Sequence, residues 1–155
     1  MAYLSGASPA LVQGRRERTR SGQLRHLLSA RDLTLDDVDE FCQAADDFES
    51  GHAPRQQLIG RTVALLFFQS STRTRLGFES AAVALGAHCI GMEDMSASRT
   101  NSSIGESIED CAAVVSRLAD AIVVRHHECS AAARMAATSI VPVINAGDGW
   151  NEHPS

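Results

Sequence analysis

The chain has 155 residues, of which 44% are hydrophobic and 21% are charged, and its formal net charge is −5. This length fits one domain with a buried core. The mild negative charge gives no support for general nucleic-acid binding, although a local pocket can still be basic. No stretch approaches the roughly 20 apolar residues of a membrane helix, and no apolar signal core begins the chain. We therefore expect a cytoplasmic protein with neither a nucleic acid nor a membrane as partner.

The first part of the chain has no hydrophobic periodicity. Residues 1–22 are small, polar and partly basic, and they are predicted to form a flexible lead-in to a domain over residues 23–155. The basic run from Arg15 to Ser21 is also compatible with a transit peptide, which leaves that alternative open.

The first helix is predicted from Leu35 to Phe48, where apolar residues recur at helical spacing. Thr34 followed by Asp37 three residues later is typical of a capping box, in which the two side chains bond the backbone at the helix start. Gly51 and Pro54 are expected to end the helix.

Apolar β segments and helical segments alternate through the rest of the chain. Strands are predicted over residues 62–68, 87–92, 121–124 and 140–144, and helices over 72–85, 105–118 and 129–137. Continuous apolar runs are typical of parallel strands that are covered on both faces. The order of elements predicts an α/β fold, a three-layer α/β/α arrangement around a four-stranded parallel sheet.

The junction between the first strand and its helix has the pattern of an anion site. It reads Ser71-Thr72-Arg73-Thr74-Arg75. N–H groups at a helix start attract negative charge, the hydroxyls add donors, and an arginine can grip two phosphate oxygens. Arginines at every second position also commonly form a solvated face, so this segment alone leaves both interpretations open. Because Ser71, Arg125 and Asn145 each follow a predicted strand, we expect them to converge at one sheet edge.

The cysteines and histidines show no metal-site spacing. Cys42, Cys89, Cys111 and Cys129 lie in apolar segments without a CxxC pair, and they are predicted to be buried, reduced thiols. His126 and His127 are adjacent and would face opposite sides of an extended segment. There is also no GxGxxG turn after the first strand and no GxSxG elbow. We therefore expect no metal and no cofactor.

Four motifs together resemble one enzyme family. They are the 71–75 segment, Gly105-Glu106-Ser107-Ile108-Glu109-Asp110, Asp120-Ala121-Ile122-Val123-Val124-Arg125-His126, and Asn145-Ala146-Gly147-Asp148-Gly149 followed by His153-Pro154. Their order is similar to the carbamoyl-phosphate-binding domain of the aspartate and ornithine carbamoyltransferases, from about Leu33 to the last residue. The segment before the His-Pro pair resembles the aspartate branch.

The resemblance implies one half of the two-domain carbamoyltransferase fold and assigns site residues. The residues implied to bind carbamoyl phosphate are Ser71, Thr72, Arg73, Thr74, Arg125 and His153. The first four would hold the phosphate, and Arg125 and His153 would reach the carbamoyl end. Arg73, Arg125 and His153 are thereby the implied catalytic residues, because donors aimed at a developing oxyanion lower the barrier.

The implied reaction transfers the carbamoyl group to an amino-acid amine, for the aspartate branch yielding N-carbamoylaspartate in pyrimidine biosynthesis. The resemblance also implies a homotrimer with sites at subunit boundaries. The second, amino-acid-binding domain is missing, so we expect weak or no turnover from this chain alone. We also expect an exposed Trp150 and a tendency to associate.

The chain departs from the family in the loop before Gly105. Ile104 stands where the family has a lysine that reaches a neighbouring subunit. Arg99, Ser102 or Ser103 are the candidates to replace its function, and a plain polar connection is the alternative. The chain also stops at His153-Pro154-Ser155, which fits a truncated first domain, half of a split enzyme, or a degenerate module. Two functional alternatives stay open: another acceptor, such as ornithine or a specialised amine, and a non-catalytic anion-binding homologue.

Overall fold

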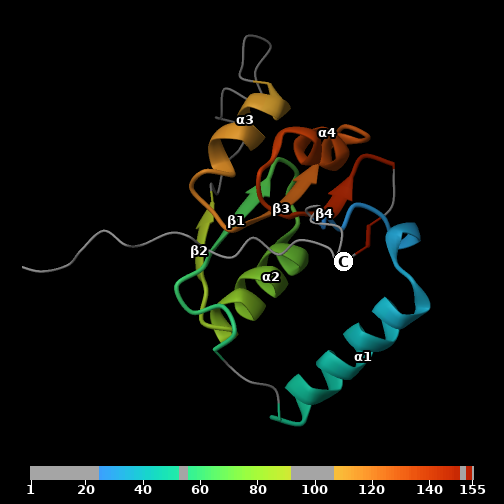
Figure 1. Cartoon of the computed structure of the whole chain (residues 1–155). Coiled ribbons are helices and arrows are strands. Elements are labelled where there is room, and N and C mark those ends of the chain that lie inside the picture. The colour runs from blue at the N-terminus through green and yellow to red at the C-terminus, as the bar shows by residue number, and fades with distance from the viewer. Residues whose placement is uncertain (1–24, 53–55, 92–106, 151–152, 155) are drawn as a thin grey trace, which may run out of the picture.

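The computed structural model describes residues 25–52, 56–91, 107–150 and 153–154. Its elements are η1 (Ala30–Asp32), α1 (Leu35–Glu49), β1 (Thr62–Phe67), α2 (Thr72–Ala84), β2 (His88–Gly91), α3 (Ile108–Val115), β3 (Ala121–His126), α4 (Ala131–Thr138) and β4 (Val143–Asp148). The strands form a parallel sheet in the order β2-β1-β3-β4. In Figure 1, α2 lies on one face and α3 and α4 on the other. The predicted α/β/α fold with its four-stranded sheet is confirmed.

Side chains on both faces of β1 are buried, which explains its continuous apolar sequence. Ala64, Leu66 and Phe68 pack in the cluster that includes α3 and α4. Leu65 and Phe67 point the other way, into the cluster that contains Phe78 of α2. Successive strand residues alternate between faces, so a strand between two helix layers has no polar side.

A short segment before η1 extends the sheet beyond β4. Leu27 forms an isolated parallel bridge with Ile144. Its N–H donates to the Val143 carbonyl at 2.9 Å, and its carbonyl accepts from the Asn145 N–H at 2.8 Å. This segment is too short for a periodic pattern, so the sequence did not predict it. The expected lead-in, residues 1–22, lies outside the described residues.

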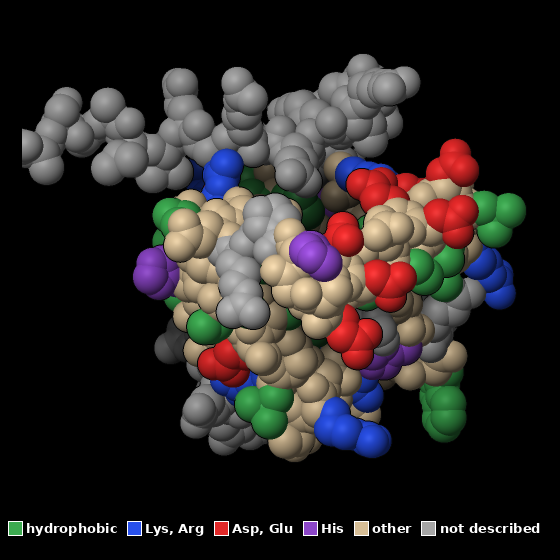
Figure 2. Space-filling view, turned by 90° about the horizontal axis from the view of Figure 1, so that it is seen from below, with side chains coloured by type: hydrophobic (Ala, Val, Ile, Leu, Met, Phe, Trp, Pro, Cys, Tyr) green, Lys and Arg blue, Asp and Glu red, His purple; other side chains and the backbone are tan. Residues whose placement is uncertain are grey.

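Helix α1 begins with the predicted capping box. The Asp37 N–H donates to Thr34 Oγ1 at 3.2 Å, and Asp37 accepts from the Thr34 N–H at 2.9 Å. That backbone bond, followed by the Arg25 guanidinium, lowers the pKa of Asp37 to about 2. No residue of α1 is buried, however, and Phe41 remains 48% exposed. Figure 2 shows acidic and apolar side chains close together on this side of the molecule. The helical pattern is right, but none of the apolar residues on this helix is buried in the described structure.

The predicted limits of three elements differ from the structure, and the first two of these elements carry site residues. Strand β3 continues through His126, and β4 begins at Val143 and runs to Asp148. Arg125 and Asn145 therefore lie within strands rather than after them. Helix α3 ends at Val115, and Leu118, predicted on its apolar face, is 65% exposed. The sequence did not predict the last part of β4, because polar residues lie there. Their side-chain hydrogen bonds replace the usual apolar packing of a strand.

The prediction of four buried thiols holds only in part. All four cysteines are free, but only Cys111 is buried; Cys89 is half-buried, and Cys42 and Cys129 are exposed. Cys42 lies on α1, where no residue is buried, and Cys129 follows the end of β3. Among the described helices, none is long and apolar enough to cross a membrane.

Candidate functional site

The amino end of α2 follows β1 at the carboxyl edge of the sheet. Ser71 is the N-cap residue, and its side chain makes no capping bond to the helix backbone. Its hydroxyl instead donates to Thr74 Oγ1 at 3.0 Å. Thr72 and Arg73 are exposed, and Arg73 makes no ion pair with any described residue. Uncapped N–H groups beside hydroxyls and a solvent-facing guanidinium have the chemistry of an anion site.

Arg125 lies on β3 beside the end of β1. Its residue partner across the sheet is Phe67. Its Nη1 donates to the Ala146 carbonyl at 2.9 Å, which fixes one side of the guanidinium. The Nε atom is buried and has no hydrogen-bond partner among the described residues. A buried donor without a partner costs free energy, which makes the surroundings of Arg125 unusual for the interior of a sheet.

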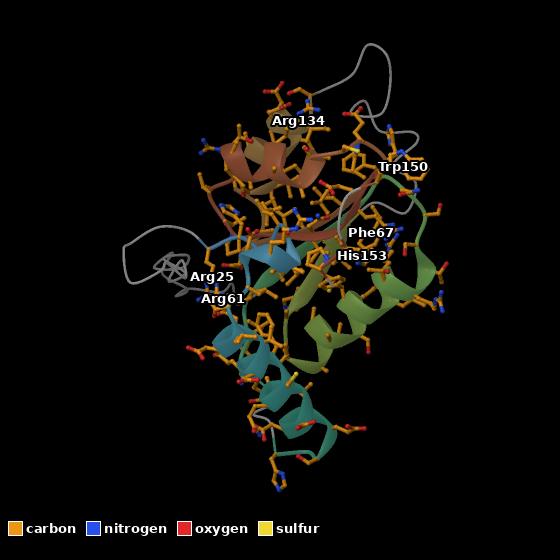
Figure 3. The ribbon with its side chains drawn as sticks, turned by 90° about the vertical axis from the view of Figure 1, so that its right-hand side faces the viewer. Arg25, Arg61, Phe67, Arg134, Trp150 and His153 are labelled. Atoms are coloured by element: carbon orange, nitrogen blue, oxygen red, sulfur yellow. The ribbon has the colours of Figure 1, made fainter. Side chains whose placement is uncertain are left out.

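Gly147 on β4 brings Arg125 and His153 together. The φ angle of Gly147 is +114°, a region that side chains rarely adopt. A Cβ atom at this position would lie 2.7 Å from Arg125 Nη1 and 3.0 Å from His153 Cδ2. Only a glycine leaves room for both side chains. In Figure 3, His153 and Phe67 lie at the same end of the sheet.

The predicted site residues thus fall into two groups at one edge. Arg125 and His153 meet at Gly147, and Ser71, Thr72, Arg73 and Thr74 lie at the start of α2, which follows the neighbouring strand β1. The loop positions Arg99, Ser102, Ser103 and Ile104 lie outside the described residues. The sequence did not predict the role of Gly147, because its positive φ angle and the approach of two side chains to it depend on the fold.

His126, the neighbour of Arg125, is buried and takes no part in either group. Its ring packs on Phe68 and stacks on His127, with ring centroids 4.8 and 4.4 Å away. The two histidines therefore do not face opposite sides as predicted, because the strand ends at His126. Burial, followed by the neighbouring His127, lowers the pKa of His126. The ring accepts the Glu128 N–H at Nδ1, at 2.9 Å.

Ligand atoms of His126, His127 and Glu128 lie within 4.8 Å of one another, as a metal site would require. Two contacts oppose that use. The Nδ1 lone pair of His126 already accepts a backbone N–H, and Glu128 accepts from Arg134 Nη1 at 3.1 Å. A cation would have to displace both partners, so we do not assign a metal site.

Beside the site, Trp150 is 98% exposed, as expected from the sequence. It borders a hollow of about 610 Å³ that also contacts η1, the start of α4 and Asp148. None of the predicted site residues lines this hollow, so it is separate from the two groups described above.

Comparison with known proteins agrees with these features. A family model described as aspartate/ornithine carbamoyltransferase, carbamoyl-P binding domain, matches residues 25–155. The aspartate carbamoyltransferase catalytic subunit of Methanococcus vannielii is 42% identical, over 85% of this chain and 44% of its own length.

Solved structures give the same result. The catalytic subunit of M. jannaschii aspartate transcarbamoylase superimposes with a TM-score of 0.74 and 38% identity, covering 84% of this chain and 43% of that one. An ornithine carbamoyltransferase from Burkholderia thailandensis gives a TM-score of 0.73 and 35% identity, covering 84% and 45%. The chain spans less than half the length of these relatives. It belongs to the aspartate/ornithine carbamoyltransferase family and corresponds to its carbamoyl-phosphate-binding domain.

Proposed function

We propose that this chain binds carbamoyl phosphate at the carboxyl edge of its sheet and serves as the carbamoyl-phosphate-binding half of an aspartate carbamoyltransferase. The observation that carries the proposal is the pairing of Arg125 with His153 across Gly147, at the sheet edge where α2 begins. The two groups match the two ends of the ligand, a phosphate and a carbamoyl group. Family membership supports the same assignment.

The phosphate is held by Ser71, Thr72, Arg73 and Thr74. The amino end of α2 contributes its dipole and its first N–H groups, and the exposed Arg73 supplies a guanidinium that can contact two oxygens. Such contacts act alike on inorganic phosphate and on carbamoyl phosphate. They therefore supply affinity without distinguishing the two ligands.

The carbamoyl carbonyl is held by Arg125 and His153. When an amine attacks the carbonyl carbon, negative charge grows on its oxygen and phosphate departs from the carbon. A donor already aimed at that oxygen is worth about 3 kcal/mol of the barrier. Arg125, whose Nη1 is fixed by the Ala146 carbonyl, fits this role.

Aspartate is the proposed acceptor, because the aspartate carbamoyltransferase catalytic subunits are the curated relatives that the chain resembles. The polypeptide that binds it corresponds to the part of those relatives which this chain does not span. A homotrimer in the cytoplasm is part of the same proposal.

The test is isothermal titration of the chain with carbamoyl phosphate and, separately, with inorganic phosphate. We expect tighter binding of carbamoyl phosphate. Arg73→Ala should weaken both ligands by about tenfold or more, whereas Arg125→Ala should reduce only the preference for carbamoyl phosphate. Arg117→Ala removes the same charge from an exposed turn before β3 and should change neither affinity. Equal affinity for the two ligands in the unmodified chain would contradict the proposal.

A further inference from the structure

Buried polar side chains gather at the end of β4. Among the described residues four polar side chains are buried, and three of them are His126, Asn145 and Asp148. Burying a polar group is unfavourable unless it is hydrogen-bonded. A concentration of such groups at one corner of an otherwise apolar sheet therefore calls for a specific reason.

The corner is irregular where Arg125 lies. From Val124 to His126, β3 advances two residues, while its partner β4 advances three, from Asn145 to Asp148. One extra residue of β4 thus bulges opposite Arg125. Such a bulge turns the backbone of its strand locally, and bulges often re-aim groups beside active sites. Here the bulged Ala146 carbonyl accepts from Arg125 Nη1, and Gly147 spaces Arg125 from His153.

The Asn145 side chain forms hydrogen bonds across the bulge. Its Oδ1 accepts the Gly147 N–H at 2.8 Å. Its Nδ2 donates to the Leu28 carbonyl at 2.9 Å and to Asp148 Oδ1 at 3.3 Å. Because the Gly147 N–H is a donor and the Leu28 carbonyl is an acceptor, the Asn145 amide must direct Oδ1 toward Gly147 and Nδ2 toward Leu28. One side chain therefore ties together both ends of the bulge and the segment before η1.

We infer that Asn145 is a positioning residue for the carbamoyl end of the site, acting through the bulge that aims Arg125. It does not reach the ligand itself. With Asn145 in place, the Ala146 carbonyl and Gly147 are held where they orient the guanidinium. Without Asn145, the Gly147 N–H loses its acceptor. The Ala146 carbonyl, which accepts from Arg125, is then no longer held in one position. The expected effect on ligands rests on the proposed function, whereas the effect on Arg125 does not.

Asn145→Ser is the direct test, because a serine cannot span Gly147, Leu28 and Asp148 together. We expect the preference for carbamoyl phosphate over inorganic phosphate to fall by about tenfold, with the affinity for phosphate itself unchanged. A control variant away from the corner is Asp120→Asn. Asp120 bonds Arg61 and the Thr62 N–H, both at 2.9 Å, at the opposite edge of the sheet. That variant should lower the melting temperature without changing the preference.

A double variant that exchanges the side chains at positions 145 and 148 tests for rescue. In the double variant Asn145→Asp with Asp148→Asn, a carboxylate still accepts the Gly147 N–H, and an amide at position 148 can donate to it. We expect a preference within about threefold of the unmodified chain, since one donor to Leu28 is still lost. If Asn145→Ser does not fold, this double variant carries the test, and a folded double variant without any preference would overturn the inference.

A ligand-free measurement separates the inference from the proposed function. The Arg125 Nε–H resonance should shift or broaden in Asn145→Ser and keep its position in Asp120→Asn. An unchanged resonance in folded Asn145→Ser would overturn the positioning role, whatever the chain binds. If instead the resonance moves but the unmodified chain does not prefer carbamoyl phosphate, the proposed function fails and the positioning role stands.

Discussion

The two parts of the candidate site are built in opposite ways. At the β3–β4 corner, Arg125 is held by a carbonyl of a bulged strand, and the buried Asn145 side chain donates to the buried Asp148 carboxylate. At the amino end of α2, Thr72 and Arg73 face solvent, and the half-buried Ser71 hydroxyl donates to Thr74 Oγ1.

This difference separates selectivity from affinity. A guanidinium that is fixed before the ligand arrives loses little side-chain entropy on binding. It can therefore favour a ligand whose carbonyl oxygen meets its N–H groups over water in the same place. Exposed donors at a helix start attract any dianion and gain order only when one binds. We therefore expect the corner to determine which ligand is preferred and the start of α2 to determine how tightly phosphate is held.

Gly147→Ala breaks the corner and gives the largest expected effect. The new methyl group would meet Arg125 Nη1 at 2.7 Å, on a backbone with φ of +114°. We expect a loss of about 2 kcal/mol in unfolding free energy together with loss of the preference for carbamoyl phosphate. Denaturant unfolding and titration measure the two.

The control for that change is Gly77→Ala in α2, where no described atom beyond the chain neighbours and the backbone of the helix itself lies within 4 Å of the new Cβ. Because alanine is a better helix former than glycine, this variant should gain up to about 1 kcal/mol and keep its ligand preference. Equal stability of the two alanine variants would show that the corner is not sterically constrained.

Arg73→Lys tests the other part of the site. The charge remains, but an ammonium cannot contact two phosphate oxygens in the planar geometry of a guanidinium. We expect carbamoyl phosphate and inorganic phosphate to lose affinity equally, by about tenfold, so that their ratio is unchanged. Arg117→Lys at the exposed turn before β3 provides the matched control. A change in the ratio would mean that Arg73 also contacts the carbamoyl end.

The corner should also be sensitive to acid through His126. Burial lowers the pKa of this residue below its ordinary value of 6.5. The unfolded chain therefore binds a proton more readily than the folded one, and stability falls as the pH drops below about 6.5. Burial also lowers the pKa of His26, which accepts the Val143 N–H at 3.1 Å, and this adds to the loss.

His126→Phe keeps a ring against Phe68 and removes the titrating group. The difference in melting temperature between about pH 7 and pH 5 should therefore shrink in this variant. His52→Gln, at an exposed position after α1, should leave the difference as it is. An undiminished difference in His126→Phe would assign the acid sensitivity to other groups.

The smallest effect on overall stability is expected in α1, where the same contrast between packed and exposed structure recurs. Thr34→Ala removes an N-cap worth about 1 kcal/mol to the helix. Because no α1 residue is buried, hydrogen exchange in α1 should accelerate by about fivefold while the global melting temperature stays constant.

Ser107→Ala removes the equivalent cap from α3, where the Ser107 hydroxyl accepts the Asp110 N–H at 3.0 Å. Helix α3 contributes Ile108, Cys111 and Ala112 to the core, so this variant should lower the global melting temperature. A matching decrease in Thr34→Ala would show that α1 is coupled to the core after all.

The same contrast explains how far the sequence could predict the structure. Apolar runs identified the sheet and its helices because burial on two faces leaves a continuous pattern, and the spacing from Thr34 to Asp37 identified a cap that is made locally. The motifs named Arg125 and His153 but not what joins them. The bulge at Gly147 depends on the register between β3 and β4, and the contact of Leu27 with Ile144 depends on a chain separation that no local pattern encodes.

The exposed face of α1 shows the opposite limit. Its apolar spacing predicts burial, but a pattern alone does not identify the surface that would cover it, and the described structure contains none.

The most direct test of the two-part site is a nuclear magnetic resonance titration of the chain with carbamoyl phosphate, following the amides of Thr72–Thr74 and of Gly147–Asp148 together. The account predicts that both sets shift with one common midpoint, and that inorganic phosphate shifts the α2 set while leaving Gly147 and Asp148 in place. If carbamoyl phosphate moves only one set, or if phosphate moves both sets equally, the two groups of residues do not form a single site that distinguishes the carbamoyl end.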